Sequence, residues 1–228
     1  MEFRKDINGL RAIAVIVVVL FHFNVVGFSG GFIGVDIFFV ISGFLMTKII
    51  NSRIQENSFS IINFYLARGR RIIPPLAILS ILVMVFGWFT LAPIEYKTLS
   101  KHVVSSITFL SNFIYQKEAG YFDLDSSYKL LLHTWSLSAE WQFYLIYPLV
   151  FILFKRHIFK AILCLTAFSF ALSIYYSYNN PSISYFLVHC RAWEMLAGAI
   201  VYFLKEKQSE QIKSYFFLGL ILITLGLI

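Results

Sequence analysis

The sequence has little charge and few hydrophilic connectors. Of its 228 residues only 14% are charged and 59% are hydrophobic, and the mean hydropathy is +0.76. This balance is far from that of a soluble domain. The apolar segments follow one another so closely that no soluble core fits between them, and only the loop 51–63 is hydrophilic. The composition therefore predicts a polytopic membrane protein.

Other absences narrow the fold class. The apolar runs are continuous and lack the alternation of a β-barrel. The N-terminal run has no small-residue cleavage site after it, so we expect a retained helix and not a signal peptide. The two cysteines, Cys164 and Cys190, match no metal-ligand or redox spacing, and no metal site is expected. No internal repeat is visible. We expect one all-α domain, a polytopic membrane helix bundle over residues 1–228.

Acidic residues are also fewer than basic ones. Lys and Arg number 19 against 12 Asp and Glu, a net charge of +7. In a soluble protein this excess would suggest nucleic acid, but here it gathers in a few short loops, where orientation in the membrane explains it better. The positive-inside rule assigns four clusters to the cytoplasm: Arg4 and Lys5; Lys48, Arg53, Arg68, Arg70 and Arg71; Lys155, Arg156 and Lys160; and Lys205, Lys207 and Lys213. The N-terminus is then cytoplasmic, and no nucleic-acid partner is expected.

Eight apolar segments account for most of the chain. They are 10–26, 31–50, 72–92, 103–115, 137–154, 158–178, 183–204 and 215–228. The fourth is short and contains several Ser and an Asn, which is typical of a re-entrant or interfacial element. We therefore expect about seven spanning helices plus this short one, with 93–102 and 116–136 outside. The last segment is still apolar at Ile228, so we expect an incomplete chain.

A charged pair brackets the first segment, LRAIAVIVVVLFHF. Arg11 and His22 are separated by ten residues, nine of them Ala, Val, Ile or Leu. On a helix, eleven steps make three turns plus about 20°, so both side chains share a face, about 16 Å apart along the axis. His22 then lies near the middle of the bilayer, where an ionisable residue suggests function. A hydrogen bond to a neighbouring helix is the alternative.

Asp36 opens the second segment after three glycines. Gly30, Gly31 and Gly34 in GFSGGFIGVDIFFV would allow a tight turn and close helix approach. They lack the full phosphate-loop pattern. A carboxylate at the depth of Asp36 needs a cation, a hydrogen-bond partner or a proton. Asp36 either orients or charge-balances His22 or is a structural anchor.

Three arginines precede Pro74 and Pro75, which we expect to open the third span. Arg68, Arg70 and Arg71 in NFYLARGRRIIPPL are either a topology signal or a phosphate site, because guanidinium groups make bidentate bonds to phosphate oxygens. Arg11 begins its helix on the same side, so one anionic ligand could contact both places.

Two further groups lie near the predicted outer face. His133, Trp135 and Glu140 stand in KLLLHTWSLSAEWQFYLIYPL. The aromatic residues could be a belt at the membrane interface, and the Glu140 carboxyl group could exchange protons in a site. Arg191 and Glu194 lie three residues apart in VHCRAWEMLAG, which favours an ion pair. The topology thus predicts one site with a cationic inner end and an outer end bearing His22, Asp36 and Glu140.

The chain resembles the acyltransferase-3 family of integral-membrane acyltransferases, which modify bacterial surface polysaccharides. The resemblance lies in NGLRAIAVIVVVLFH, GGFIGVDIFFVISGFL, FYLARGRRIIPPL, HTWSLSAEWQFYLIYPL and RAWEMLAGAIVYFL, in the family's order. Family members typically have about ten spans, so this chain resembles their N-terminal portion.

The resemblance implies roles for particular residues. The family's Arg, ten residues, then His falls on Arg11 and His22, its Arg-x-x-Arg on Arg68 and Arg71, and its motif Glu on Glu140. Two positions depart from the pattern. Trp141 stands where the family often has a second acidic residue, and Arg70 adds a charge inside the arginine pair.

The function we expect is transfer of an acyl group, acetyl above all, from cytoplasmic acyl-coenzyme A to a hydroxyl of an extracytoplasmic sugar such as O-antigen. His22 is the expected base or acyl carrier, with Glu140 or Asp36 fixing its tautomer. Arg11, Arg68 and Arg71 would hold the coenzyme's phosphates, and His133, Trp135, Arg191 and Glu194 would contact the acceptor. Acyl-coenzyme A is a substrate here, and no bound cofactor is expected.

Two other interpretations stay open. Intramembrane His, Asp, Glu and Arg also form proton relays in transporters and flippases, although no inverted repeat is visible here. A truncated, inactive remnant would keep the motifs without the function. The expected location is the bacterial inner membrane.

Overall fold

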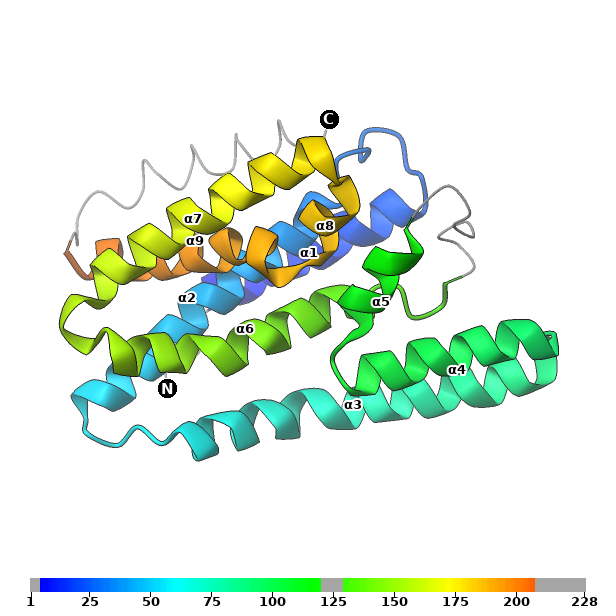
Figure 1. Ribbon diagram of the computed structural model, residues 1–228, viewed down its shortest axis with the longest axis horizontal. Helices are drawn as coiled ribbons and strands as arrows, with labels where there is room; N and C mark the ends of the chain where they lie inside the picture. The colour runs from blue at the N-terminus through cyan, green and yellow to red at the C-terminus, as the bar shows by residue number, and fades with distance from the viewer. Residues whose placement is uncertain (1–4, 120–128, 208–228) are drawn as a thin grey trace. The chain divides into compact units, whose positions relative to one another are not determined.

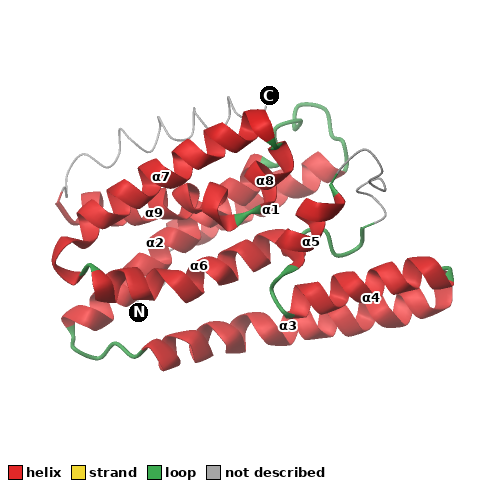
Figure 2. Cartoon of the chain, viewed as in Figure 1, coloured by secondary structure: helices red, strands yellow, loops and turns green. Residues whose placement is uncertain are grey.

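The computed structural model describes residues 5–119 and 129–207, and in that part of the chain the secondary structure is helical, joined by short loops (Figures 1 and 2). The elements in chain order are α1 (Lys5–His22), α2 (Ile33–Gln55), α3 (Ile61–Thr90), α4 (Pro93–Ile107), α5 (Ser111–Glu118), α6 (Thr134–Leu153), the short 3₁₀ helix η2 (Lys155–His157), α7 (Ile158–Asn179), α8 (Pro181–Phe186) and α9 (Val188–Lys207). The all-α prediction is confirmed. The predicted segment 215–228 lies outside the described residues.

Contacts divide the chain into two compact units. The first unit is Met1–Asn51, Phe159–Thr166 and Glu194–Ile228, and the second is Ser52–Ile158 and Ala167–Trp193. The first unit therefore contains α1 and most of α2 and α9, whereas α3, α4, α5, α6 and α8 belong to the second.

In the first unit, α1 and α2 form a hairpin held together by glycines. A Cβ atom at Gly31 would overlap the carbonyl oxygen of Val17, and one at Gly34 would approach that of Ala14. These two positions therefore need glycine because the start of α2 touches the backbone of α1. The close helix approach predicted for them is confirmed.

Helices α2 and α9 also meet through glycines in the first unit. A Cβ at Gly43 would overlap the carbonyl of Met195, and one at Gly198 would overlap the carbonyl of Val40. Such small residues let two helix backbones approach closely, and the resulting van der Waals packing helps membrane helices associate. The side-chain amide of Asn51 also donates to the Tyr202 hydroxyl at 3.2 Å.

In the second unit, α3 begins before the two prolines. The helix starts at Ile61, behind Ser60, whose hydroxyl accepts a hydrogen bond from the backbone N–H of Asn63 at 3.4 Å. Pro74 and Pro75 lie inside the helix, which therefore begins before the apolar segment 72–92, and where the third span opens stays a prediction. Each proline removes one backbone donor without ending the helix, which membrane helices tolerate. As a result the arginines lie on α3 itself.

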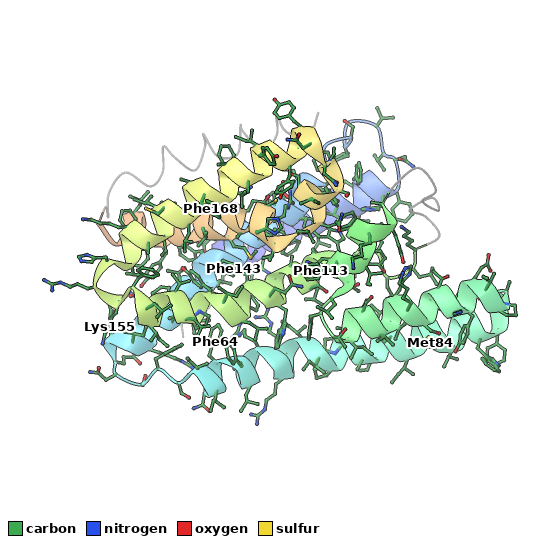
Figure 3. All side chains as sticks on the ribbon, in the orientation of Figure 1. Phe64, Met84, Phe113, Phe143, Lys155 and Phe168 are labelled. Atoms are coloured by element: carbon green, nitrogen blue, oxygen red, sulfur yellow. The ribbon has the colours of Figure 1, made fainter. Side chains whose placement is uncertain are left out.

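The fourth apolar segment is split between α4 and α5. Phe109, with φ of +56°, lies in the break between the two helices. Residues 93–102, which precede the predicted fourth segment, are helical because Pro93 begins α4 and the Glu95 carboxylate accepts a hydrogen bond from the Ala92 N–H at 3.0 Å. Helix α4 lies alongside α3, where Met84 packs against buried Leu99 and Val103 (Figure 3).

Four stretches among the described residues are long and apolar enough to cross a membrane. They are α2, α3, α6 and Lys155–Asn179, which comprises η2 and α7. Neither α4 nor α5 is among them, in agreement with a fourth segment that does not cross. The chain is thus a multi-pass helical membrane protein, and the count of seven spanning helices stays a prediction.

Candidate functional site

His22 is the last residue of α1, and its ring orientation is set by its own helix. The Nδ1 atom lies 2.7 Å from the carbonyl oxygen of Val18, one turn earlier. A carbonyl only accepts hydrogen bonds, so Nδ1 carries the proton in the neutral ring and Nε2 carries the lone pair. The role of Asp36 or Glu140 in orienting this ring stays a prediction, and the Val18 carbonyl is the acceptor that faces Nδ1. Nε2 is thereby the nitrogen that can act as base or nucleophile.

Asp36 and His22 lie at the same end of the α1–α2 hairpin. Asp36 is in the first turn of α2, where the helix dipole stabilises a negative charge. Phe32, just before α2, meets Phe21 of α1 edge-to-face at 5.8 Å and so ties the connecting loop to His22's neighbour. The hairpin therefore gives an imidazole and a carboxylate to one end of the first unit.

The other predicted residues of the first unit lie elsewhere. Arg11 is half-buried on α1, in the helix half opposite His22. Glu194, on α9, is only 2% exposed. A carboxylate so deeply buried must have its charge balanced or be protonated. The ion pair that the spacing offers to Glu194 and Arg191 stays a prediction.

In the second unit, a polar stripe sets the rotation of α6. Thr134, Ser138 and Gln142 are spaced by four residues and so share one face of the helix. The Thr134 hydroxyl pairs with that of Ser106 at 2.7 Å, and Ser138 pairs with Ser111 at the same distance. Gln142 donates to the Phe109 carbonyl at 2.8 Å and to the Asn112 side-chain oxygen at 2.9 Å. Because this face meets α4 and α5, Glu140, two residues from Ser138, points to the other side.

That other side of α6 meets the arginine-bearing part of α3. The Tyr65 hydroxyl donates to the Leu145 carbonyl at 2.7 Å. One turn further along α3, a Cβ at Gly69 would lie 3.7 Å from the ring of Trp141. The residue number rises from Tyr65 to Gly69 on α3 while it falls from Leu145 to Trp141 on α6, so the two helices are antiparallel here. Arg68 is thereby level with Trp141 and its neighbours on α6.

Arg68 and Glu140 consequently belong to one electrostatic group. The Arg68 guanidinium interacts with the charges of Glu140, Arg71 and Arg53 and with the Tyr144 phenol, and the Tyr144 hydroxyl donates a hydrogen bond to Glu140. The predicted topology puts Arg68 and Glu140 at opposite ends of the site, whereas the structure brings them together. The reason is that α3 begins before the prolines and runs back along α6.

The two departures from the family pattern have clear positions. Trp141 stacks on Phe109 at 4.5 Å with an angle of 15° between the rings, so it fills space between helices. Arg70 and Arg71 are exposed, while Arg68 is half-buried, and its Nε atom is buried without a hydrogen-bond partner among the described residues. Of the three arginines, Arg68 is the one most enclosed by protein.

Trp135 and Arg191, both predicted to contact the acceptor, lie together in the second unit. The Arg191 guanidinium lies 5.7 Å from the ring centroids of both Trp135 and Tyr185. The two rings are 4.8 Å apart, which makes a clamp for the cation. Trp135 is buried at 3% exposure, whereas Tyr185 is 42% exposed. His133 is exposed and precedes α6, close in sequence to Trp135.

The structure also shows a charged cluster that the sequence analysis missed. Glu118, at the end of α5, accepts hydrogen bonds from Lys101 Nζ at 2.6 Å and His102 Nε2 at 2.8 Å, and Lys129 Nζ is 3.8 Å away. Burial raises the pKa of Glu118, but the bonds from Lys101 and His102 outweigh it and hold this pKa below its ordinary value. Burial also raises the pKa of Tyr115, whose ring lies 4.8 Å from that of His102.

One missed residue did carry a signal in the sequence. Tyr144 follows Glu140 by four residues, so both side chains must share a face of α6. Nothing local pointed to the pairing of His102 with Glu118, because the two residues lie on different helices.

Comparison with known proteins agrees with these features. The chain matches the model of the acyltransferase-3 family, an acyltransferase domain, over residues 4–228. It is 34% identical to the peptidoglycan O-acetyltransferase OatA of Listeria monocytogenes, over 89% of this chain and 34% of that protein. The O-acetyltransferase OatA of Staphylococcus aureus is 33% identical over 89% of this chain and 35% of its own length.

A third relative is of more similar length. An uncharacterised protein of Haemophilus influenzae is 40% identical over 73% of this chain and 72% of its own length. The chain spans about a third of the two O-acetyltransferases that it matches. No solved structure shows a significant match.

Proposed function

Because the chain belongs to the acyltransferase-3 family, we propose that it forms the membrane part of an O-acetyltransferase that acylates a bacterial surface glycan. The donor is cytoplasmic acyl-coenzyme A, acetyl above all, and the acceptor is a sugar hydroxyl on the far side of the inner membrane, with the N-terminus of the chain in the cytoplasm. A peptidoglycan sugar, as in the name of the Listeria relative, and lipopolysaccharide O-antigen are the two acceptor classes to test.

The observation that carries this proposal is the bond between His22 and Val18. With Nδ1 held at 2.7 Å from the carbonyl, Nε2 carries the lone pair that acts as base or nucleophile in this proposal. On a direct route, Nε2 takes the proton of the acceptor hydroxyl while the oxygen of that hydroxyl attacks the thioester carbonyl. The carbon–sulfur bond then breaks, and the proton passes to the coenzyme A thiolate.

A stepwise route uses the same nitrogen. Nε2 attacks the thioester carbonyl first, the carbon–sulfur bond breaks, and coenzyme A leaves as the thiolate. The sugar hydroxyl oxygen then attacks the acyl carbonyl, the carbon–nitrogen bond breaks to restore the neutral imidazole, and the hydroxyl proton ends on the thiolate. On both routes the imidazole is transiently positive. Asp36, at the same end of the hairpin, would stabilise that cation.

The remaining residues bind substrates in this proposal. Arg11, Arg68 and Arg71 hold the phosphates of the coenzyme, for which guanidinium groups are well suited. His133, Trp135, Arg191 and Glu194 contact the acceptor. Support for this role comes from the clamp of Arg191 beside the exposed ring of Tyr185, because sugars pack on aromatic faces and bond to planar donors.

Mass spectrometry of surface glycans tests the proposal. Cells would express this chain, His22→Ala, or His157→Ala, an exposed histidine of η2 that removes an imidazole elsewhere. We expect the mass of an acetyl group on peptidoglycan or O-antigen with the unaltered chain and with His157→Ala, but not with His22→Ala at equal protein level. Acetylation that persists in His22→Ala would overturn the role of His22. Acetylation absent from every sample would overturn the proposed activity of this chain.

A further inference from the structure

We propose that Glu140 and Tyr144 are positioning residues for Arg68 and hold its guanidinium ready for an anionic group, the phosphates of the donor under the proposed function. Glu140 then acts through Arg68. This inference rests on the proposed function for its ligand, but the arrangement of the three side chains is a property of the unliganded protein.

Hydrogen bonds to neighbouring helices fix the rotation of α6. Thr134, Ser138 and Gln142 bind α4, α5 and the Phe109 carbonyl, with distances between 2.7 and 2.9 Å. These bonds lock one face of the helix. Glu140 and Tyr144, one turn apart, are therefore held on a different face.

The partner of that face is α3. The hydroxyl of Tyr65 reaches the Leu145 carbonyl at 2.7 Å, and Gly69 lets α3 approach Trp141. Arg68 lies between these two contacts on α3. It is thereby carried to Glu140 and Tyr144 by backbone geometry and not by the flexibility of its own side chain.

The three side chains interact through charge and a hydrogen bond. Tyr144 donates its hydroxyl to Glu140, and the carboxylate attracts the guanidinium. The Nε atom of Arg68 is buried and lacks a hydrogen-bond partner among the described residues. A buried donor of this kind needs an acceptor, and a phosphate oxygen is a strong one. Arg53 and Arg71 add positive charge around the same place, so one carboxylate leaves the group net cationic.

A mutant cycle on thermal stability tests the arrangement without any substrate. Arg68→Gln, Glu140→Gln and the double variant would be unfolded in detergent. We expect the double variant to lose less stability than the sum of the two single losses, since removing either charge already ends the interaction. Strictly additive losses would overturn the proposal, whether or not the protein transfers acyl groups.

Kinetics with acetyl-coenzyme A tests the functional consequence. Tyr144→Phe and Glu140→Gln should raise KM for the donor about tenfold, leave kcat within about threefold, and leave the pH profile of kcat unchanged. Tyr175→Phe, which removes an exposed hydroxyl on α7, is the matched control and should change neither constant. A fall in kcat with a shifted pH profile and an unchanged KM would instead show that Glu140 serves His22, and the proposal would be wrong. If the unaltered protein transfers nothing, the proposed function fails while the stability cycle still decides the arrangement.

Discussion

The glycine contacts between α2 and α9 lead to a sharp prediction about stability. A methyl group at Gly43 would overlap the Met195 carbonyl, and one at Gly198 would overlap the Val40 carbonyl and approach the Phe44 backbone nitrogen. Backbone atoms cannot turn aside as a flexible side chain can, so α9 must move away from α2. We expect Gly43→Ala and Gly198→Ala each to cost about 1–3 kcal/mol, the range for overpacked cores.

A glycine elsewhere in the same unit provides the control. Gly9 lies inside α1, and a Cβ there would meet nothing within 4 Å. Gly9→Ala should therefore stabilise the helix by about 0.5–1 kcal/mol, because alanine loses less backbone entropy on folding. The same substitution thus has opposite signs at Gly9 and at Gly43.

The assay is thermal unfolding of the purified protein in detergent, followed by tryptophan fluorescence. The double variant should lose less than the sum of the two single losses, because one outward movement of α9 makes room for both methyl groups. Melting temperatures for Gly43→Ala and Gly198→Ala at or above that of the unaltered protein would refute this account of the α2–α9 contact.

Two further predictions concern the second unit. The lowered pKa of Glu118 contributes stability that is present above about pH 4 and is lost as the pH falls through the folded-state pKa. Glu118→Gln should therefore lose less thermal stability on acidification than the unaltered protein. The same acid dependence in both proteins would contradict this. Arg191→Lys keeps the charge but loses the planar group between Trp135 and Tyr185, so it should cost about 0.5–1 kcal/mol, whereas Arg156→Lys at an exposed turn should leave the unfolding temperature unchanged.

Much of the helical framework follows from the sequence because membrane helices satisfy their own backbone. The predicted segments 31–50, 137–154 and 158–178 correspond to α2 (Ile33–Gln55), α6 (Thr134–Leu153) and α7 (Ile158–Asn179). A long apolar run has no other way to bury its polar backbone groups in lipid. The glycines around the start of α2 could be interpreted from the sequence for a similarly local reason, since only glycine lets two backbones touch at Gly31 and Gly34.

Helix boundaries near polar residues were harder to predict from the sequence. The start of α3 at Ile61 depends on a cap at Ser60 and on prolines that the helix accommodates, and α4 depends on Glu95 bonding back to Ala92. A hydropathy pattern does not detect the Ser60 cap or the bond from Ala92 to Glu95, because each acts through a single hydrogen bond at a helix end.

The sequence by itself determined that the chain is helical, lies in a membrane and carries His22 and Arg11 on one helix, because composition and the helical repeat are local properties. Only the tertiary structure decided which charges are neighbours. Glu140 meets Arg68 and Glu118 meets His102 because antiparallel helices bring distant residues level with one another. That register depends on interhelical contacts such as the one between Tyr65 and Leu145, 80 residues apart, and no pattern within a single helix contains it.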